Sequence, residues 1–109
     1  MIQEILLNAG LVLNETFRET RLLNPPKDVT YAVYMDACER RGSDCSNLII
    51  DHDVTVELYE DYPDAEAETR LEAELDARGI EYSKQSRYWI HEEQLYQVVY
   101  EFEYTEKIR

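Results

Sequence analysis

The segment Leu95-Tyr96-Gln97-Val98-Val99-Tyr100-Glu101-Phe102-Glu103-Tyr104-Thr105 decides the fold class of this chain. Its even positions from 96 are Tyr, Val, Tyr, Phe and Tyr, and its odd positions from 97 are Gln, Val, Glu, Glu and Thr. Because successive side chains of a strand point to opposite faces, the segment predicts a strand with one apolar face and one solvated, acidic face. A sheet that is wet on one face is usually antiparallel, so we expect a small α+β domain.

The other elements follow from periodicity and from stop signals. Apolar residues at three- and four-residue steps predict a helix over residues 2–18, and a second helix is predicted over residues 63–78, with Gly79 just past its end. Strands are predicted at 30–37, 48–59, 80–90 and 95–105, with a connector at 21–28 and polar turns at 40–46 and 92–94. The order α-β-β-α-β-β predicts one domain over residues 1–109, a four-stranded antiparallel sheet with both helices packed on its apolar face.

The composition of the chain limits the kinds of molecule that we expect it to bind. The chain has 109 residues, with 24 acidic against 11 basic side chains and a formal charge of −13. This charge argues against ordinary nucleic-acid binding and against adsorption to anionic membranes. No stretch approaches the roughly 20 apolar residues that span a bilayer, and the first residues, Met1-Ile2-Gln3-Glu4, lack the basic start of a signal peptide. We therefore expect a cytoplasmic protein.

The two cysteines, Cys38 and Cys45, flank a polar segment and are expected to be reduced thiols. Two sulfurs with no histidine beside them do not make a zinc site, and His52 and His91 lie elsewhere in the sequence. His52 falls on the apolar side of its strand and is expected to be a satisfied core or interface residue. His91 precedes Glu92 and Glu93, but consecutive residues point in different directions, so no metal site is expected there.

The carboxylates of the predicted strands are the remaining candidates for catalysis. Paired acids perform acid–base chemistry when burial drives their pKa values apart, whereas these are expected to form a solvated, charged surface (Asp51, Asp53, Glu57, Glu101 and Glu103). Neither the three glycines nor the serines fall in a phosphate-binding or nucleophile motif. The sequence therefore predicts no catalytic residue, no cofactor and no enzyme activity.

Tyrosine is unusually frequent, with nine residues, most of them on predicted strands. A core of this size is expected to leave some aromatic side chains exposed, and exposed Tyr and Trp favour protein interfaces. The residues predicted to contact other proteins are Glu39, Arg40, Arg41, Asp44, Tyr59, Tyr88, Trp89, Glu101 and Glu103.

Taken together, the chain resembles the tail terminator, or tail-completion and head–tail joining, proteins of bacteriophages and prophages. The resemblance rests on Val29-Thr30-Tyr31-Ala32-Val33-Tyr34 after a double proline, and on Leu48-Ile49-Ile50-Asp51-His52-Asp53-Val54-Thr55-Val56-Glu57-Leu58-Tyr59. The helix with Glu66, Glu68, Leu71, Glu72 and Leu75 and the closing strand from Tyr96 to Phe102 complete it, over about residues 1–107.

The resemblance implies a structural virion protein, made in the host bacterial cytoplasm and located in the virion tail or neck. Such proteins form a ring, commonly hexameric, that caps the tail tube, so the implied partners are other copies of the chain, the tail tube protein and the head–tail connector protein. The resemblance implies no catalytic residue. An acidic ring would let duplex DNA pass without sticking. The alternative is a small acidic phage protein that mimics DNA to inhibit a nucleic-acid enzyme, or an adaptor for a host protein.

Overall fold

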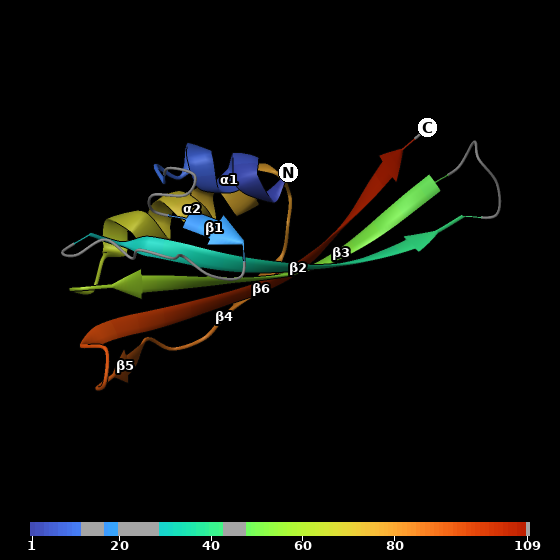
Figure 1. Ribbon diagram of the computed structural model, residues 1–109. Helices are drawn as coiled ribbons and strands as arrows, with labels where there is room; N and C mark the ends of the chain where they lie inside the picture. Colours follow the sequence, from blue (N-terminus) through green and yellow to red (C-terminus); the bar gives the residue numbers. More distant parts are fainter. Residues whose placement is uncertain (12–16, 20–28, 43–47, 109) are drawn as a thin grey trace.

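The computed structural model describes residues 1–11, 17–19, 29–42 and 48–108. The elements, in chain order, are α1 (Ile2–Asn8), β1 (Phe17–Glu19), β2 (Tyr31–Arg41), β3 (Leu48–Glu60), α2 (Ala65–Ala77), β4 (Tyr82–Lys84), β5 (Tyr88–Ile90) and β6 (Leu95–Ile108). They form one sheet in the order β1-β2-β3-β6-β4, with β5 also pairing with β6 (Figure 1). The chain is thus a single α+β domain, as the sequence predicts.

The two longest strands alternate in the way the sequence predicts. On β6, Val98, Tyr100 and Phe102 are buried, while Glu101 and Glu103 are exposed. Each buried residue faces a buried residue of the antiparallel neighbour β3, namely Leu58, Val56 and Val54. The interior therefore forms on one face of the sheet, called here the inner face, and the opposite face is called the outer face.

Both helices cover the inner face (Figure 1). Ile5 and Leu6 of α1 and Leu71 and Leu75 of α2 are essentially fully buried in one cluster with the inner-face side chains of β2, β3 and β6. Burying each such side chain stabilises the fold by about 1.5–3 kcal/mol. The predicted packing of two helices on one apolar face is confirmed.

Helix α2 begins and ends where the sequence signals indicate. The Asp64 side chain accepts a hydrogen bond from the backbone N–H of Ala67 at 3.0 Å, which caps the first turn. Gly79 follows the last turn with a φ of +70°, a conformation that glycine adopts without steric cost.

The predicted helix over residues 2–18 is wrong in its length. α1 ends at Asn8, and Gly10 has a φ of +97°, which breaks the helical path. Arg18 belongs to β1, which pairs parallel to β2 through Phe17↔Ala32, Arg18↔Val33 and Glu19↔Tyr34. The sheet is therefore mixed, with six strands, instead of four antiparallel strands. Residues 12–16 and the predicted connector at 21–28 lie outside the described residues.

The predicted strand over residues 80–90 is two short strands. Lys84 pairs with Tyr100 and Tyr88 pairs with Gln97, so three residues, 85–87, oppose the two residues 98–99. One extra residue on one strand of an antiparallel pair is a β-bulge, which interrupts the ladder and redirects side chains.

No helix among the described residues is long and apolar enough to cross a membrane.

Candidate functional site: a projecting ribbon and a buried ionic network

Strands β2, β3 and β6 continue well beyond the helices as a three-stranded ribbon (Figure 1). β3 has 13 residues, which span about 43 Å at about 3.3 Å per residue. α2 also has 13 residues, but a helix of that length spans only about 20 Å. The helices therefore cover about half of the sheet. The other half, which we call the ribbon, comprises residues 35–41, 48–53 and 103–108.

β2 and β6, which lie on either side of β3 in the ribbon, each have one edge with no ladder partner among the described residues. β1 pairs with β2 only up to Tyr34, and β4 pairs with β6 only up to Phe102. Beyond these positions, Met35–Arg41 and Glu103–Ile108 each pair on one side only, with β3. Such edges present rows of backbone N–H and C=O groups to which another strand can add.

The outer face of the sheet is divided between two kinds of surface. On the helix-covered half, Tyr31 stacks on Tyr59 with ring centroids 5.1 Å apart, and Val33 and Leu95 pack around them. On the ribbon and next to it the outer face is acidic, with Asp51, Asp53, Glu101 and Glu103. Asp53 and Glu103 are both exposed and lie directly opposite each other, an unfavourable like-charge pair.

The residues predicted to form an interface are not all at one place. Glu39, Arg40 and Arg41 lie in the edge strand β2, so the predicted turn at 40–46 is wrong at its first residues, and Asp44 lies outside the described residues. The Arg41 Nε donates to Asp51 Oδ2 at 2.6 Å across the outer face. Glu101 and Glu103 belong to the acidic part of that face, as expected.

The aromatic residues predicted at the interface belong to the other half of the sheet. Tyr59 is partly buried against Tyr31, and its hydroxyl donates to Glu57 at 3.0 Å. Tyr88 and Trp89 of β5 are 64% and 40% exposed, and the Trp89 ring lies 4.8 Å from that of Tyr96. Tyr88 pairs with Gln97 and therefore shares the outer face with Tyr59.

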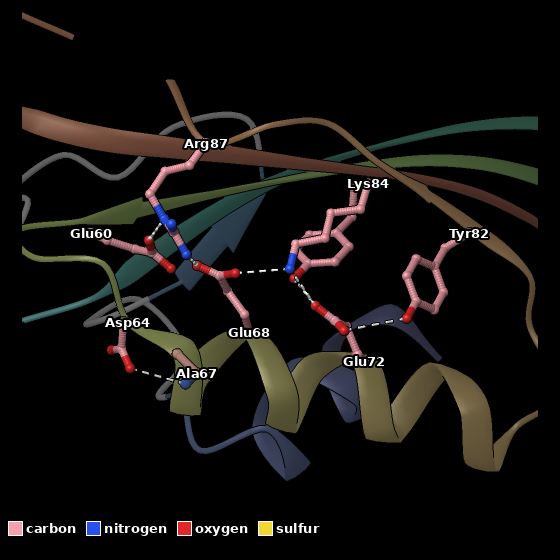
Figure 2. Close-up of polar contacts among 9 residues, drawn as sticks. Glu60, Asp64, Ala67, Glu68, Glu72, Tyr82, Lys84 and Arg87 are labelled. Atoms are coloured by element: carbon pink, nitrogen blue, oxygen red, sulfur yellow. Dashed lines mark hydrogen bonds and ion pairs between the residues drawn. The ribbon is translucent and has the colours of Figure 1, made fainter. Parts of the chain in front are cut away.

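An ionic network that the sequence analysis did not identify lies on the inner face of the sheet, next to α2 (Figure 2). Glu60, at the end of β3, and Glu68, on α2, are 0% and 4% exposed. The Arg87 guanidinium contacts both, with Nε 3.3 Å from Glu60 Oε1 and Nη2 2.7 Å from Glu68 Oε2. The bulge at residues 85–87 directs Arg87 to this network.

The network continues along α2 to Glu72. The Lys84 ammonium lies 2.8 Å from Glu68 and 2.8 Å from Glu72, and the Tyr100 hydroxyl donates to Glu72 at 2.6 Å. Hydrogen bonds to charged groups stabilise by about 1.5–3 kcal/mol each. The network therefore fastens the β4–β5 segment to α2.

The two buried carboxyl groups have opposite pKa shifts. Burial raises the pKa of Glu60, and the hydrogen bond and charge of Glu68 raise it further, to about 7. Burial also acts to raise the pKa of Glu68, but hydrogen bonds from Glu60, Lys84 and Arg87 outweigh it and lower the pKa to about 2. Between about pH 2 and pH 7 the two carboxyl groups therefore hold one proton.

The sequence does carry a signal that these two glutamates are buried. Glu60 extends the inner-face alternation of Val54, Val56 and Leu58, and Glu68 precedes Leu71 and Leu75 by three and seven positions.

The distance in sequence between His52 and the cysteines does not keep them apart in the structure, so it was a wrong reason for excluding a shared metal site. His52 is far from the cysteines in sequence, yet it lies directly opposite Cys38 in the β2–β3 ladder. Its ring is buried between Asp36, Cys38, Tyr104 and Glu106. Cys38 carries a free thiol, and Cys45 lies outside the described residues.

No family model matches this sequence, and no curated protein matches it.

Proposed function

We propose that this chain is a structural phage or prophage assembly protein that caps the tail tube as an oligomeric ring and helps to join tail to head. The observation that carries the proposal is the ribbon, with two strand edges that have no ladder partner among the described residues. The resemblance in sequence over residues 1–107 provides the identity of the assembly. The ribbon supports it because a subunit that must bind copies of itself needs such a surface.

These two edges belong to different strands. When the β2 edge of one copy pairs with the β6 edge of the next, each copy uses two different surfaces, and the contact is heterologous. Heterologous contacts produce a closed ring when the rotation between copies closes. Met35–Arg41 and Glu103–Ile108 offer a pairing of about six residues, or about 20 Å at the usual rise. This length matches an ordinary strand pairing in a globular protein.

The charge of the outer face suits a channel through which DNA passes. In a ring, the acidic outer-face side chains Asp53, Glu101 and Glu103 of each copy line the lumen. A wall of carboxylates repels phosphates, so duplex DNA moves through without binding. The exposed aromatic residues Tyr88 and Trp89, at the other end of the sheet, are then available to the tail tube protein or to the head–tail connector protein.

Complementation of a phage that lacks the gene tests the role of the ribbon edge. Met35 is exposed on the β2 edge, and Met35→Lys places an obstructing charge there, as natural edge strands do. Thr55 is the cross-strand partner of Met35 on the central strand, so Thr55→Lys adds the same charge to the same face one strand inward. We expect Thr55→Lys to restore plaques and Met35→Lys to fail although it is folded. Equal complementation by both variants contradicts assembly through this edge.

The acidic outer face also favours the alternative, a small acidic phage protein that mimics DNA or binds a host protein. That function needs the carboxylates as the contact surface itself and needs no second copy. Glu101→Gln with Glu103→Gln then abolishes inhibition of a nucleic-acid enzyme while tails assemble normally. A ring subunit with the same changes still caps tails, because the ribbon edges remain intact.

A further inference from the structure

The inner face of the ribbon carries a cluster of Asp36, Cys38 and His52. Cys38 and His52 are directly opposite each other in the β2–β3 ladder, and Asp36 precedes Cys38 by two residues on the same face. His52 is 9% exposed and the Asp36 side chain is 13% exposed, whereas Cys38 is exposed to solvent. The donor atoms of these three side chains all lie within 4.8 Å of one another.

The imidazole ring of His52 is fixed in one orientation. Tyr104, its partner in the β3–β6 ladder, stacks on it with ring centroids 4.3 Å apart and an angle of 8° between the planes. The Nε2 atom lies 3.0 Å from Glu106 Oε1. A carboxylate at Nε2 keeps the ring proton there when Nδ1 loses its own proton, so the Nδ1 lone pair can bind a cation.

The Nδ1 atom faces the other two side chains. It lies 2.9 Å from the carboxylate oxygens of Asp36 and 3.4 Å from the Cys38 Sγ, and this sulfur lies 3.4 Å from Asp36 Oδ1. Around a tetrahedral zinc ion, with bonds of about 2.3 Å to sulfur and about 2.0–2.1 Å to nitrogen and oxygen, the nitrogen–oxygen separation is about 3.4 Å, and the nitrogen–sulfur and sulfur–oxygen separations are about 3.6 Å. The three donor groups therefore need to move apart by only a few tenths of an ångström to hold the ion.

We propose that Asp36, Cys38 and His52 bind a zinc-type divalent cation, with water in the fourth position. One sulfur, one imidazole nitrogen and one carboxylate oxygen form a donor set for Zn²⁺ or Co²⁺, whereas Mg²⁺ and Ca²⁺ prefer oxygen alone. The exposed side of Cys38 admits the water. Glu106 is the positioning residue, since a carboxylate on the second ring nitrogen is the usual outer partner of a zinc-bound histidine. On binding, the thiol proton and the Nδ1 proton of the imidazolium pass to solvent, and the thiolate and the Nδ1 lone pair bond to the metal.

The site goes beyond ring assembly, because it ties β2 to β3 in the half of the sheet that α1 and α2 do not cover. A cation there links the edge strand to the central strand. Without the cation, an imidazolium held between Asp36 and Glu106 fills the same space as a purely ionic contact.

Titration of the purified chain with Co²⁺ under reducing conditions tests the proposal. We expect one Co²⁺ per chain, a thiolate-to-cobalt absorption band with tetrahedral d–d bands, and displacement of the cobalt by Zn²⁺. Cys38→Ser is expected to lose the thiolate band and to weaken Zn²⁺ binding at least tenfold, while Cys45→Ser keeps both. Glu106→Gln is expected to keep the band and to weaken Zn²⁺ binding by about tenfold, within the range for outer partners.

Two results would overturn the proposal. One is the absence of a thiolate band from the unaltered chain at saturating Co²⁺, which would leave the ionic contact as the whole account of the cluster. The other is a band that survives Cys38→Ser and disappears with Cys45→Ser. The unaltered chain is itself the decisive sample, so a variant that fails to fold does not obscure the outcome.

Discussion

Replacement of Glu60 by glutamine should stabilise the protein at alkaline pH and change its stability much less near pH 5. Glu60 is fully buried, and its pKa is raised to about 7 by burial and by Glu68. A glutamine keeps the shape of the protonated carboxyl group. Its carbonyl oxygen can accept from Arg87, as Glu60 Oε1 does at 3.3 Å, and its amide group takes the place of Glu60 Oε2, which is buried without a hydrogen-bond partner among the described residues.

The magnitude follows from the difference in pKa between the folded and unfolded states. The folded value of about 7 lies above the ordinary value of 4.5, so the stabilisation from the shared proton is complete below pH 4.5 and is lost as the pH rises through 7. At about 1.4 kcal/mol per pKa unit, the loss is roughly 3 kcal/mol by pH 8. The glutamine variant cannot lose this contribution and should exceed the unaltered protein by up to that amount at pH 8.

Urea unfolding at pH 5 and pH 8 measures the effect. Glu68→Gln is the matched control on the other member of the pair. It removes the charged partner that Arg87 and Lys84 share, while each keeps a contact with Glu60 or Glu72, so it should destabilise at both pH values, by about 1.5–3 kcal/mol. An equal shift in the free energy of unfolding at the two pH values, or a lower value at pH 8, for Glu60→Gln would rule out a shared proton on Glu60.

Three further substitutions test local features of the fold, each by urea unfolding. Asp64→Ala removes the cap on the Ala67 N–H together with the hydrogen bond from Thr30 Oγ1, and should cost about 1–2 kcal/mol; no change would exclude a contribution from either contact. Glu103→Lys turns the like-charge pair with Asp53 into an attractive one and should add about 0.5 kcal/mol, less at high salt. Gly79→Ala meets no atom within 4 Å, so its cost of about 1–2 kcal/mol measures the positive φ alone.

The alternation of β3 and β6 could be predicted because burial on one face selects every second residue, and Val54, Val56, Tyr100 and Phe102 satisfy that rule without interruption. The end of the first helix could not be predicted, because the apolar spacing continues past Gly10 although the helical backbone conformation does not. The parallel pairing of β1 with β2 leaves no periodic signal in three residues.

The polar clusters escaped prediction for a related reason. The contact of His52 with Cys38 depends on the register between β2 and β3, and the contact of Arg87 with Glu60 depends on a one-residue bulge. Register and bulges are set by the packed sheet, and pairs of polar residues distant in sequence carry no spacing that reveals them. The ribbon edges, which have no ladder partner among the described residues, depend on where β1 and β4 stop pairing, and such short strands carry no clear sequence pattern.

Electron microscopy of particles from the encoding phage or prophage, with this gene deleted, tests the proposed function most directly. We expect tails that vary in length or exceed the normal length, heads without attached tails, and recovery of normal virions when the gene is supplied in trans. Virions with normal tails of uniform length, joined to heads, in the absence of the gene would contradict the account.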